Sequence, residues 1–148
     1  MRPLTSEEIR ALSSRIVLEF GDGILRSEKY LFDQMTRLPC GFTDDHVPVS
    51  AALARVATDE VQVVVDPHLS NRAFAEEVAA SLGMPGAMGF VVPRGVLPEI
   101  LRFENCDMYV FDGCDRLVFV ACHEDRVIEG ERQVWTSWPI NGEMRSGK

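Results

Sequence analysis

The sequence has no long hydrophobic run. Toward the C-terminus its longest purely apolar stretch, Leu117–Cys122, is six residues, whereas a helix needs about 20 to cross a bilayer. Charged side chains also interrupt the first 20 residues, among them Glu8, Arg10 and Arg15, so the apolar core of a secretion signal is missing. We therefore expect a soluble, cytoplasmic protein with no membrane contact.

Positive charge is also scarce. The chain has 15 Lys and Arg residues against 23 Asp and Glu residues, which gives a net charge of −8. Proteins that follow a nucleic-acid backbone, or lie on anionic lipid, present an excess of basic side chains. The charge balance argues against both classes.

Motifs of metal, nucleotide and nucleophile sites are lacking as well. The four cysteines, Cys40, Cys106, Cys114 and Cys122, form no C-x-x-C pair of the kind that structural zinc sites use. The sequence contains no Walker loop, no G-x-S-x-G and no H-E-x-x-H. We expect no metal, no cofactor and no disulfide, with the thiols reduced and buried as small hydrophobes.

The composition is that of an ordinary globular protein. The chain has 148 residues, of which 46% are hydrophobic and 26% charged, and this length suits one domain. We expect a single globular domain over residues 1–140 and a frayed tail over 141–148, where Met144 is the one sizeable apolar side chain.

Helical periodicity dominates the N-terminal third. Thr5 or Ser6 with Glu8 forms the pattern of a capping box. Apolar residues at helical spacing follow, and a glycine pair then ends the helix. The predicted elements are a first helix with Ile9, Leu12, Ile16 and Phe20 on one face, a stop at 21–23, a second amphipathic helix over 25–38, a loop over 40–47 and a third helical turn from Pro48 through Val56.

The middle of the chain has a strand–helix–strand pattern. Residues 61–65 are β-branched and nearly all apolar, as in a strand that is covered on both faces. Ser70 is a good N-cap for a helix whose buried face carries Phe74, Val78 and Leu82, and a second strand covers 89–92. This order predicts a βαβ unit, a parallel strand pair with a right-handed crossover.

The last third is typical of antiparallel structure. After a short helix from Pro98, the apolar runs 108–111 and 117–120 flank Asp112–Asp115, which predicts a hairpin, and 133–138 adds a last strand. The expected fold class is thus α+β (mixed α/β): N-terminal helices, one βαβ unit and a C-terminal antiparallel hairpin that extends a single mixed sheet.

Acidic residues concentrate in the same region. Between residues 104 and 125 six carboxylates face a single cation, Arg116. Complementary fields steer and select basic partners, and Trp is enriched where binding energy concentrates. We therefore predict a non-enzymatic binding protein for a basic protein partner, with the size and charge of small acidic inhibitors such as immunity proteins. The predicted contact residues are Asp107, Asp112, Asp115, Glu124, Asp125 and Trp138.

Two other functions are consistent with the sequence. Ligands of open parallel sheets bind at the carboxyl ends of the strands, so Asp66 and His68, together with His123, are candidate catalytic residues of a small-molecule enzyme or binding domain. Adjacent strand residues point to opposite faces, which disfavours a direct Cys122–His123 couple. A homo-oligomer that pairs through the edge of its hairpin is the remaining alternative.

Overall fold

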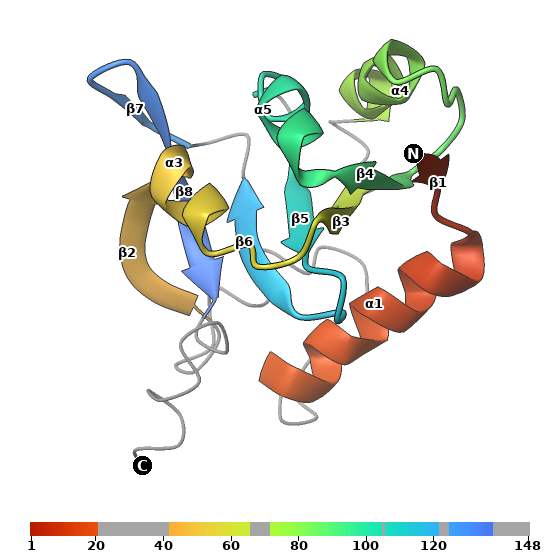
Figure 1. The fold of residues 1–148 in the computed structure, drawn as a ribbon, viewed down its shortest axis with the longest axis horizontal. Coiled ribbons are helices and arrows are strands. Elements are labelled where there is room, and N and C mark those ends of the chain that lie inside the picture. The colour runs from red at the N-terminus through yellow and green to blue at the C-terminus, as the bar shows by residue number, and fades with distance from the viewer. Residues whose placement is uncertain (21–41, 66–71, 105, 122–124, 138–148) are drawn as a thin grey trace.

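The structure is a computed structural model that describes residues 1–20, 42–65, 72–104, 106–121 and 125–137. It contains one extended sheet with short helices on both faces (Figure 1). The strands are β1 (Arg2–Pro3), β2 (Phe42–Pro48), β3 (Glu60–Val65), β4 (Gly89–Pro93), β5 (Met108–Phe111), β6 (Leu117–Ala121), β7 (Val127–Ile128) and β8 (Glu131–Ser137). The helices are α1 (Ser6–Phe20), α3 (Val49–Ala54), α4 (Arg72–Ser81), the 3-10 helix η2 (Arg94–Val96) and α5 (Leu97–Ile100).

The sheet is antiparallel throughout the described residues. Its eight strands follow the order β1-β4-β3-β5-β6-β8-β2, with β7 paired to β8 off this path. Each strand pair is antiparallel. The expected α+β fold with a mixed sheet is therefore wrong, and the protein is a mostly antiparallel sheet with a few short helices.

The predicted βαβ unit is the source of that error. Strands β3 and β4 are neighbours, but Val61 lies opposite Val92 and Val64 opposite Gly89, so they run antiparallel. The segment that contains α4 leaves and re-enters the sheet at the same end, as a hairpin connection does. A strand–helix–strand pattern has the same local periodicity in both topologies, because periodicity does not encode the end at which the chain returns.

Two helices begin where the sequence predicts. Glu8 N donates to Thr5 Oγ1 at 3.1 Å and Thr5 N donates to Glu8 Oε1 at 2.9 Å, which confirms the capping box with Thr5 as the N-cap of α1. Pro48 precedes α3 as predicted. The N–H of Ser50 in α3 donates to Glu131 Oε1 at 2.8 Å, which fastens this helix to the start of β8.

Two local predictions are wrong. Residues 42–47, expected within a loop, belong to the edge strand β2, whose pairing with β8 depends on residues far along the chain. On α4, Val78 is buried as predicted, but Phe74 is 37% exposed, and Ala75 and Ala79 complete the buried face in its place. Small alanines let a helix lie close to a sheet, so packing selected a face that hydrophobicity alone does not indicate.

The remaining local predictions are confirmed where the structure describes the residues concerned. The hairpin of β5 and β6 is confirmed, and the last strand is confirmed as β8. The short helix from Pro98 is confirmed as α5, with the proline in its first turn. The predicted helix over 25–38, the glycine stop, the Ser70 cap and the tail over 141–148 lie outside the described residues.

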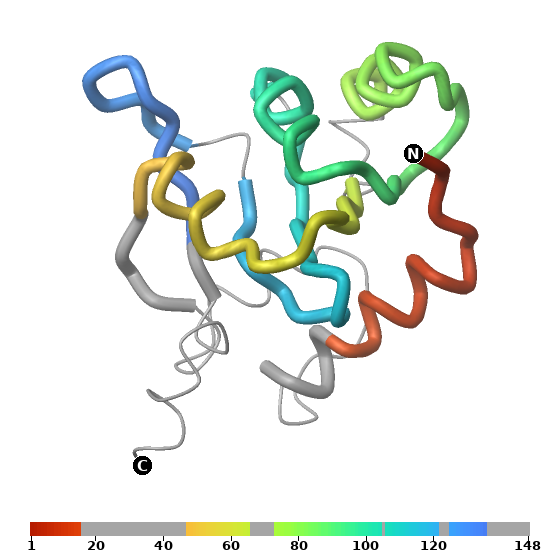
Figure 2. Tube along the Cα trace, in the orientation of Figure 1, coloured from red at the N-terminus to blue at the C-terminus, as the bar shows by residue number. Residues whose placement is uncertain are grey.

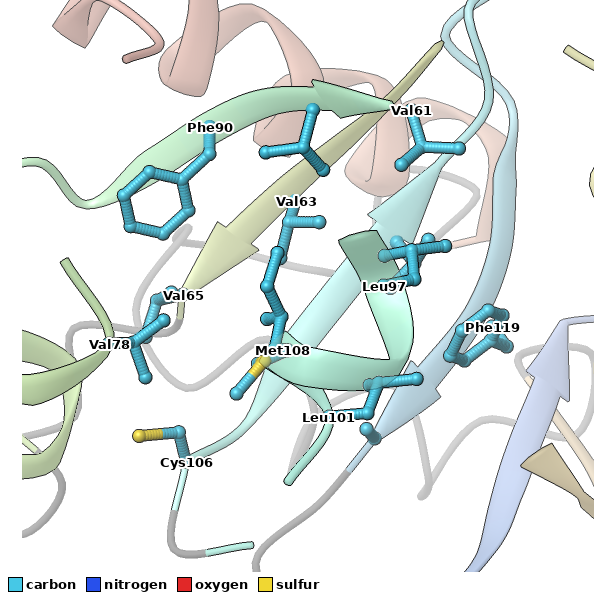
Figure 3. Packing of buried hydrophobic residues seen from close by; sticks show 14 of the residues in the cluster. Val61, Val63, Val65, Val78, Phe90, Leu97, Leu101, Cys106, Met108 and Phe119 are labelled. Atoms are coloured by element: carbon cyan, nitrogen blue, oxygen red, sulfur yellow. The ribbon is translucent and has the colours of Figure 1, made fainter. Parts of the chain in front are cut away.

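The larger core lies between the sheet and helices α3, α4 and α5 (Figure 3). Alternate residues of β3 and β5 enter it, because successive strand side chains point to opposite faces. Its central members are Val61, Val63, Val65, Val78, Phe90, Leu97, Leu101, Cys106, Met108 and Phe119.

The smaller core lies on the opposite face of the sheet, under α1. Val64 of β3 and Tyr109 of β5 point to this side and pack with Leu12 of α1. Phe111 pairs with Leu117 on this face, whereas Val110 pairs with Phe119 on the other, so β6 has one extra residue between the two pairs. The extra residue is Val118, which belongs to the larger core together with its neighbour Phe119.

Gly89 lies at the start of β4 and packs against Leu4 and against Ile9 of α1. A Cβ at this position would lie 2.8 Å from Leu4 Cδ1 and 3.1 Å from the carbonyl oxygen of Val63. We predict that Gly89→Ala lowers the free energy of unfolding by about 1–3 kcal/mol, as overpacking does. Gly95→Ala is the matched control, because nothing lies within 4 Å of its Cβ. Urea unfolding measures both, and equal stability of the two variants would contradict this packing.

Candidate functional site

The predicted acidic contact residues fall at two separate ends of the hairpin. Asp112 and Asp115 lie in the turn between β5 and β6, whereas Asp107 immediately precedes β5 at the other end of that strand. Asp107 is only 5% exposed. Five further predicted site residues lie outside the described residues, namely Asp66, His68, His123, Glu124 and Trp138. The structure therefore does not bring the described candidates together in one patch.

Asp125 is bound within the protein. Its Oδ2 accepts a hydrogen bond from Arg132 Nε at 3.0 Å, and the two side chains are 2% and 6% exposed. Arg132 also donates from Nη1 to the carbonyl oxygen of Leu101 at 2.8 Å, which links β8 to the end of α5. Asp125 thus stabilises a buried contact, and the sequence has no local signal for a pair of this spacing.

Cys106, next to Asp107, is buried in the larger core. Burial raises the pKa of its thiol to about 11, and the nearby carboxylates of Asp107 and Glu77 add to the effect. A thiol with this pKa is protonated near neutral pH and is a poor nucleophile. The prediction of a buried cysteine is confirmed here, whereas Cys114 is exposed.

Asp112 organises the β5–β6 turn. Its Oδ1 accepts from the N–H groups of Cys114 at 2.8 Å and Arg116 at 3.0 Å. Gly113 N donates to Thr58 Oγ1 at 2.9 Å, which anchors the turn to the segment before β3. The Asp112 carboxylate is therefore used inside the turn, as an Asx turn requires.

Asp115 is the exposed carboxylate of this turn. It has a φ of 64°, a left-handed conformation that Asp adopts more readily than most residues. Its Oδ1 accepts from Gln62 Nε2 at 2.6 Å, and the same Nε2 donates to the carbonyl oxygen of Asp112 at 3.1 Å. Among the described residues, Asp115 Oδ2 has no hydrogen bond or ion pair.

A cleft of about 350 Å³ lies between this turn and α1, which approach each other in Figure 1. Its size is at the lower end of ligand sites. Two carboxylates, Glu8 and Asp115, and one guanidinium, Arg15, supply its charges. The lining residues are Glu8, Ala11, Leu12, Ser14, Arg15, Gln62 and Asp115.

Sequence reasoning identified Asp115 but not the rest of this cleft. Gln62 is the one polar residue in the apolar run 61–65, and that interruption is a signal of a side chain with a polar contact. The participation of α1 has no such signal, because it depends on how the helix crosses the sheet.

The described residues show neither a metal-binding cluster nor a membrane-spanning helix. The described residues include no group of three or more His, Cys, Asp or Glu side chains placed to hold a metal ion. None of the helices in the described ranges is long and apolar enough to cross a membrane.

Comparison of the chain with known protein families, with curated proteins and with solved structures found no match.

Breaking the buried ion pair should destabilise the fold. We predict that Arg132→Met lowers the free energy of unfolding by about 3–5 kcal/mol, because it leaves the Asp125 carboxylate buried without its cation. The double variant Arg132→Met/Asp125→Leu should recover most of this loss. Urea denaturation of the two variants tests the pair, and a double variant no more stable than the single one would contradict this assignment.

The capping box should show an acid-dependent contribution. Hydrogen bonds from Arg2 and from the N–H of Thr5 lower the pKa of Glu8 from 4.5 to about 2. A lowered folded-state pKa stabilises the fold above the unfolded-state value, so this contribution is complete above about pH 4.5 and disappears as the pH falls through 2. A carboxyl NMR titration should give a midpoint near 2 for Glu8, and a higher midpoint in Arg2→Gln. A midpoint unchanged by that variant would contradict the pairing.

Proposed function

We propose that this protein binds a basic protein partner through the surface around Asp115. The observation that carries the proposal is the open Oδ2 of Asp115, a carboxylate oxygen at a cleft in a protein of net charge −8. An acidic protein attracts a basic partner over distance, and an exposed carboxylate then offers it a specific contact.

The rigidity of the turn supports this role. Thr58, Gln62 and Asp112 fix the turn through hydrogen bonds of 2.6–3.1 Å. A group that is already held in place loses little conformational entropy on binding. The proposed contact surface is therefore narrower than the sequence indicates, since Asp112 serves the turn and Asp125 serves the buried ion pair with Arg132.

The structure removes the reason for the alternative function. A ligand site at the carboxyl ends of parallel strands requires a parallel pair, and every described pair is antiparallel. The catalytic candidates Asp66, His68 and His123 lie outside the described residues. We therefore base the proposal on Asp115.

Binding of an arginine-rich peptide tests the proposal. The probes are labelled peptides of alternating arginine and serine, or lysine and serine, followed by fluorescence anisotropy at low and high salt. We expect salt-sensitive binding that Asp115→Asn weakens by about 2- to 5-fold, the value of a solvent-exposed ion pair. Asparagine keeps the Oδ1 acceptor for Gln62 and tolerates the left-handed backbone, so this substitution removes the charge and the open acceptor while it preserves the turn.

Asp59→Asn is the matched control, because it removes one charge from an exposed residue beside the turn that does not line the cleft. It should change the affinity less than Asp115→Asn does. Binding of neither peptide at low salt, or equal losses in the two variants, would overturn the proposed function.

A further inference from the structure

We infer that the cleft between α1 and the β5–β6 turn is a binding site for a guanidinium group. The inference rests on the proposed function where that group belongs to an arginine of the partner protein, and a free guanidinium compound is the other source. The negative net charge of the protein attracts any cation, whereas the groups that line the cleft would select a guanidinium.

Two hydrogen-bond acceptors of the cleft belong to side chains that hold each other in place. Gln62 Nε2 donates both to Asp115 Oδ1 and to the carbonyl oxygen of Asp112. Because both of these partners only accept, the orientation of the amide group is determined, and Oε1 points away from them. Among the described residues, neither Gln62 Oε1 nor Asp115 Oδ2 has a hydrogen bond.

This acceptor pair matches a guanidinium better than an ammonium. A guanidinium is planar and carries five N–H donors in a fixed fork, so it can donate to two fixed acceptors at once. An ammonium is a compact and strongly hydrated point charge, which gains little from a second acceptor at a set position. The contribution of Asp115 is also charge-assisted, which strengthens such bonds.

The α1 wall of the cleft suits the rest of an arginine side chain. Leu12 is buried and Ala11 lies beside it, and both line the cleft. Methylene groups of a long cationic side chain pack well on such a surface while the charged end stays near polar groups. The cleft thus has a small apolar surface at Ala11 and Leu12 of α1, beside the polar residues of that helix, and acceptors at Gln62 and Asp115.

The other charges of the cleft have opposite effects on a bound cation. Glu8 adds negative charge, but both of its carboxylate oxygens already accept from Arg2 at 2.8 Å. Arg15 has an interaction of its own and also lines the cleft. Its positive charge opposes a second guanidinium, so its removal should strengthen binding. General damage to the fold would weaken binding instead.

The test is an NMR titration of the isotope-labelled protein with three blocked amino acids: arginine, lysine and citrulline, each acetylated and methylamidated. Citrulline has nearly the shape of arginine but no charge. We expect the arginine compound to shift the side-chain amide signals of Gln62 and the backbone signal of Asp115, with an affinity at least ~3-fold above that of lysine. Citrulline should cause no saturable shift.

Variants separate the cleft from its surroundings. Asp115→Asn should abolish the preference for arginine over lysine, and Asp59→Asn should preserve it. Arg15→Gln should tighten arginine binding by about 2- to 5-fold, the value of one exposed charge pair. Equal affinity for arginine and lysine, shifts outside the cleft, or weaker binding in Arg15→Gln would each overturn the inference.

The outcomes also distinguish this inference from the proposed function. If arginine and lysine peptides bind equally and both depend on Asp115, the basic-partner proposal stands and the guanidinium site is wrong. If blocked arginine binds in the cleft but neither peptide binds, the guanidinium site stands for a small compound and the basic-partner proposal is wrong. Failure of all these probes overturns both.

Discussion

The fold depends on the burial of β3 on both of its faces. This strand lies between β4 and β5, and its alternating valines enter the two cores on opposite sides of the sheet. Apolar burial is the main favourable term in folding, and β3 shares this two-sided burial with its neighbour β5 and with β6. Gln62, the polar exception in this strand, lies at the cleft, where its amide fixes both Asp112 and Asp115. The central strand therefore also positions the candidate site.

Local patterns in the sequence identified most elements but not their arrangement. The capping box, the apolar strand 61–65 and the hairpin around Asp112 have signals within a few residues, and the structure confirms each of them. The direction of β4 and the existence of β2 depend on partners far along the chain, so short-range periodicity could not determine them. The short strand β7 was also missed. Figure 2 shows its hairpin with β8 standing out from the sheet, away from α4.

For the candidate site too, the sequence indicated the type of residue but not its arrangement. Charge counting found the acidic segment and named Asp115, but it treated all carboxylates as equivalent. The structure gives them three different roles: Asp112 organises a turn, Asp125 neutralises a buried guanidinium, and Asp115 faces the cleft. Hydrogen-bond partners decide among these roles, and the partners come from other elements. Net charge therefore does not predict which residue would contact a ligand.

The pairing of β2 with β8, two strands far apart in the sequence, has a consequence for synthesis of the chain. Edge strand β2 is made early, yet β8, the strand with which it pairs in the described residues, is made much later, with His46 opposite Trp135. Ribosomes add about 5–20 residues per second, so β2 waits on the order of ten seconds for its partner. During that interval its backbone groups remain available to other strands. A nascent chain of this protein should therefore depend on protection from aggregation until β8 has been made.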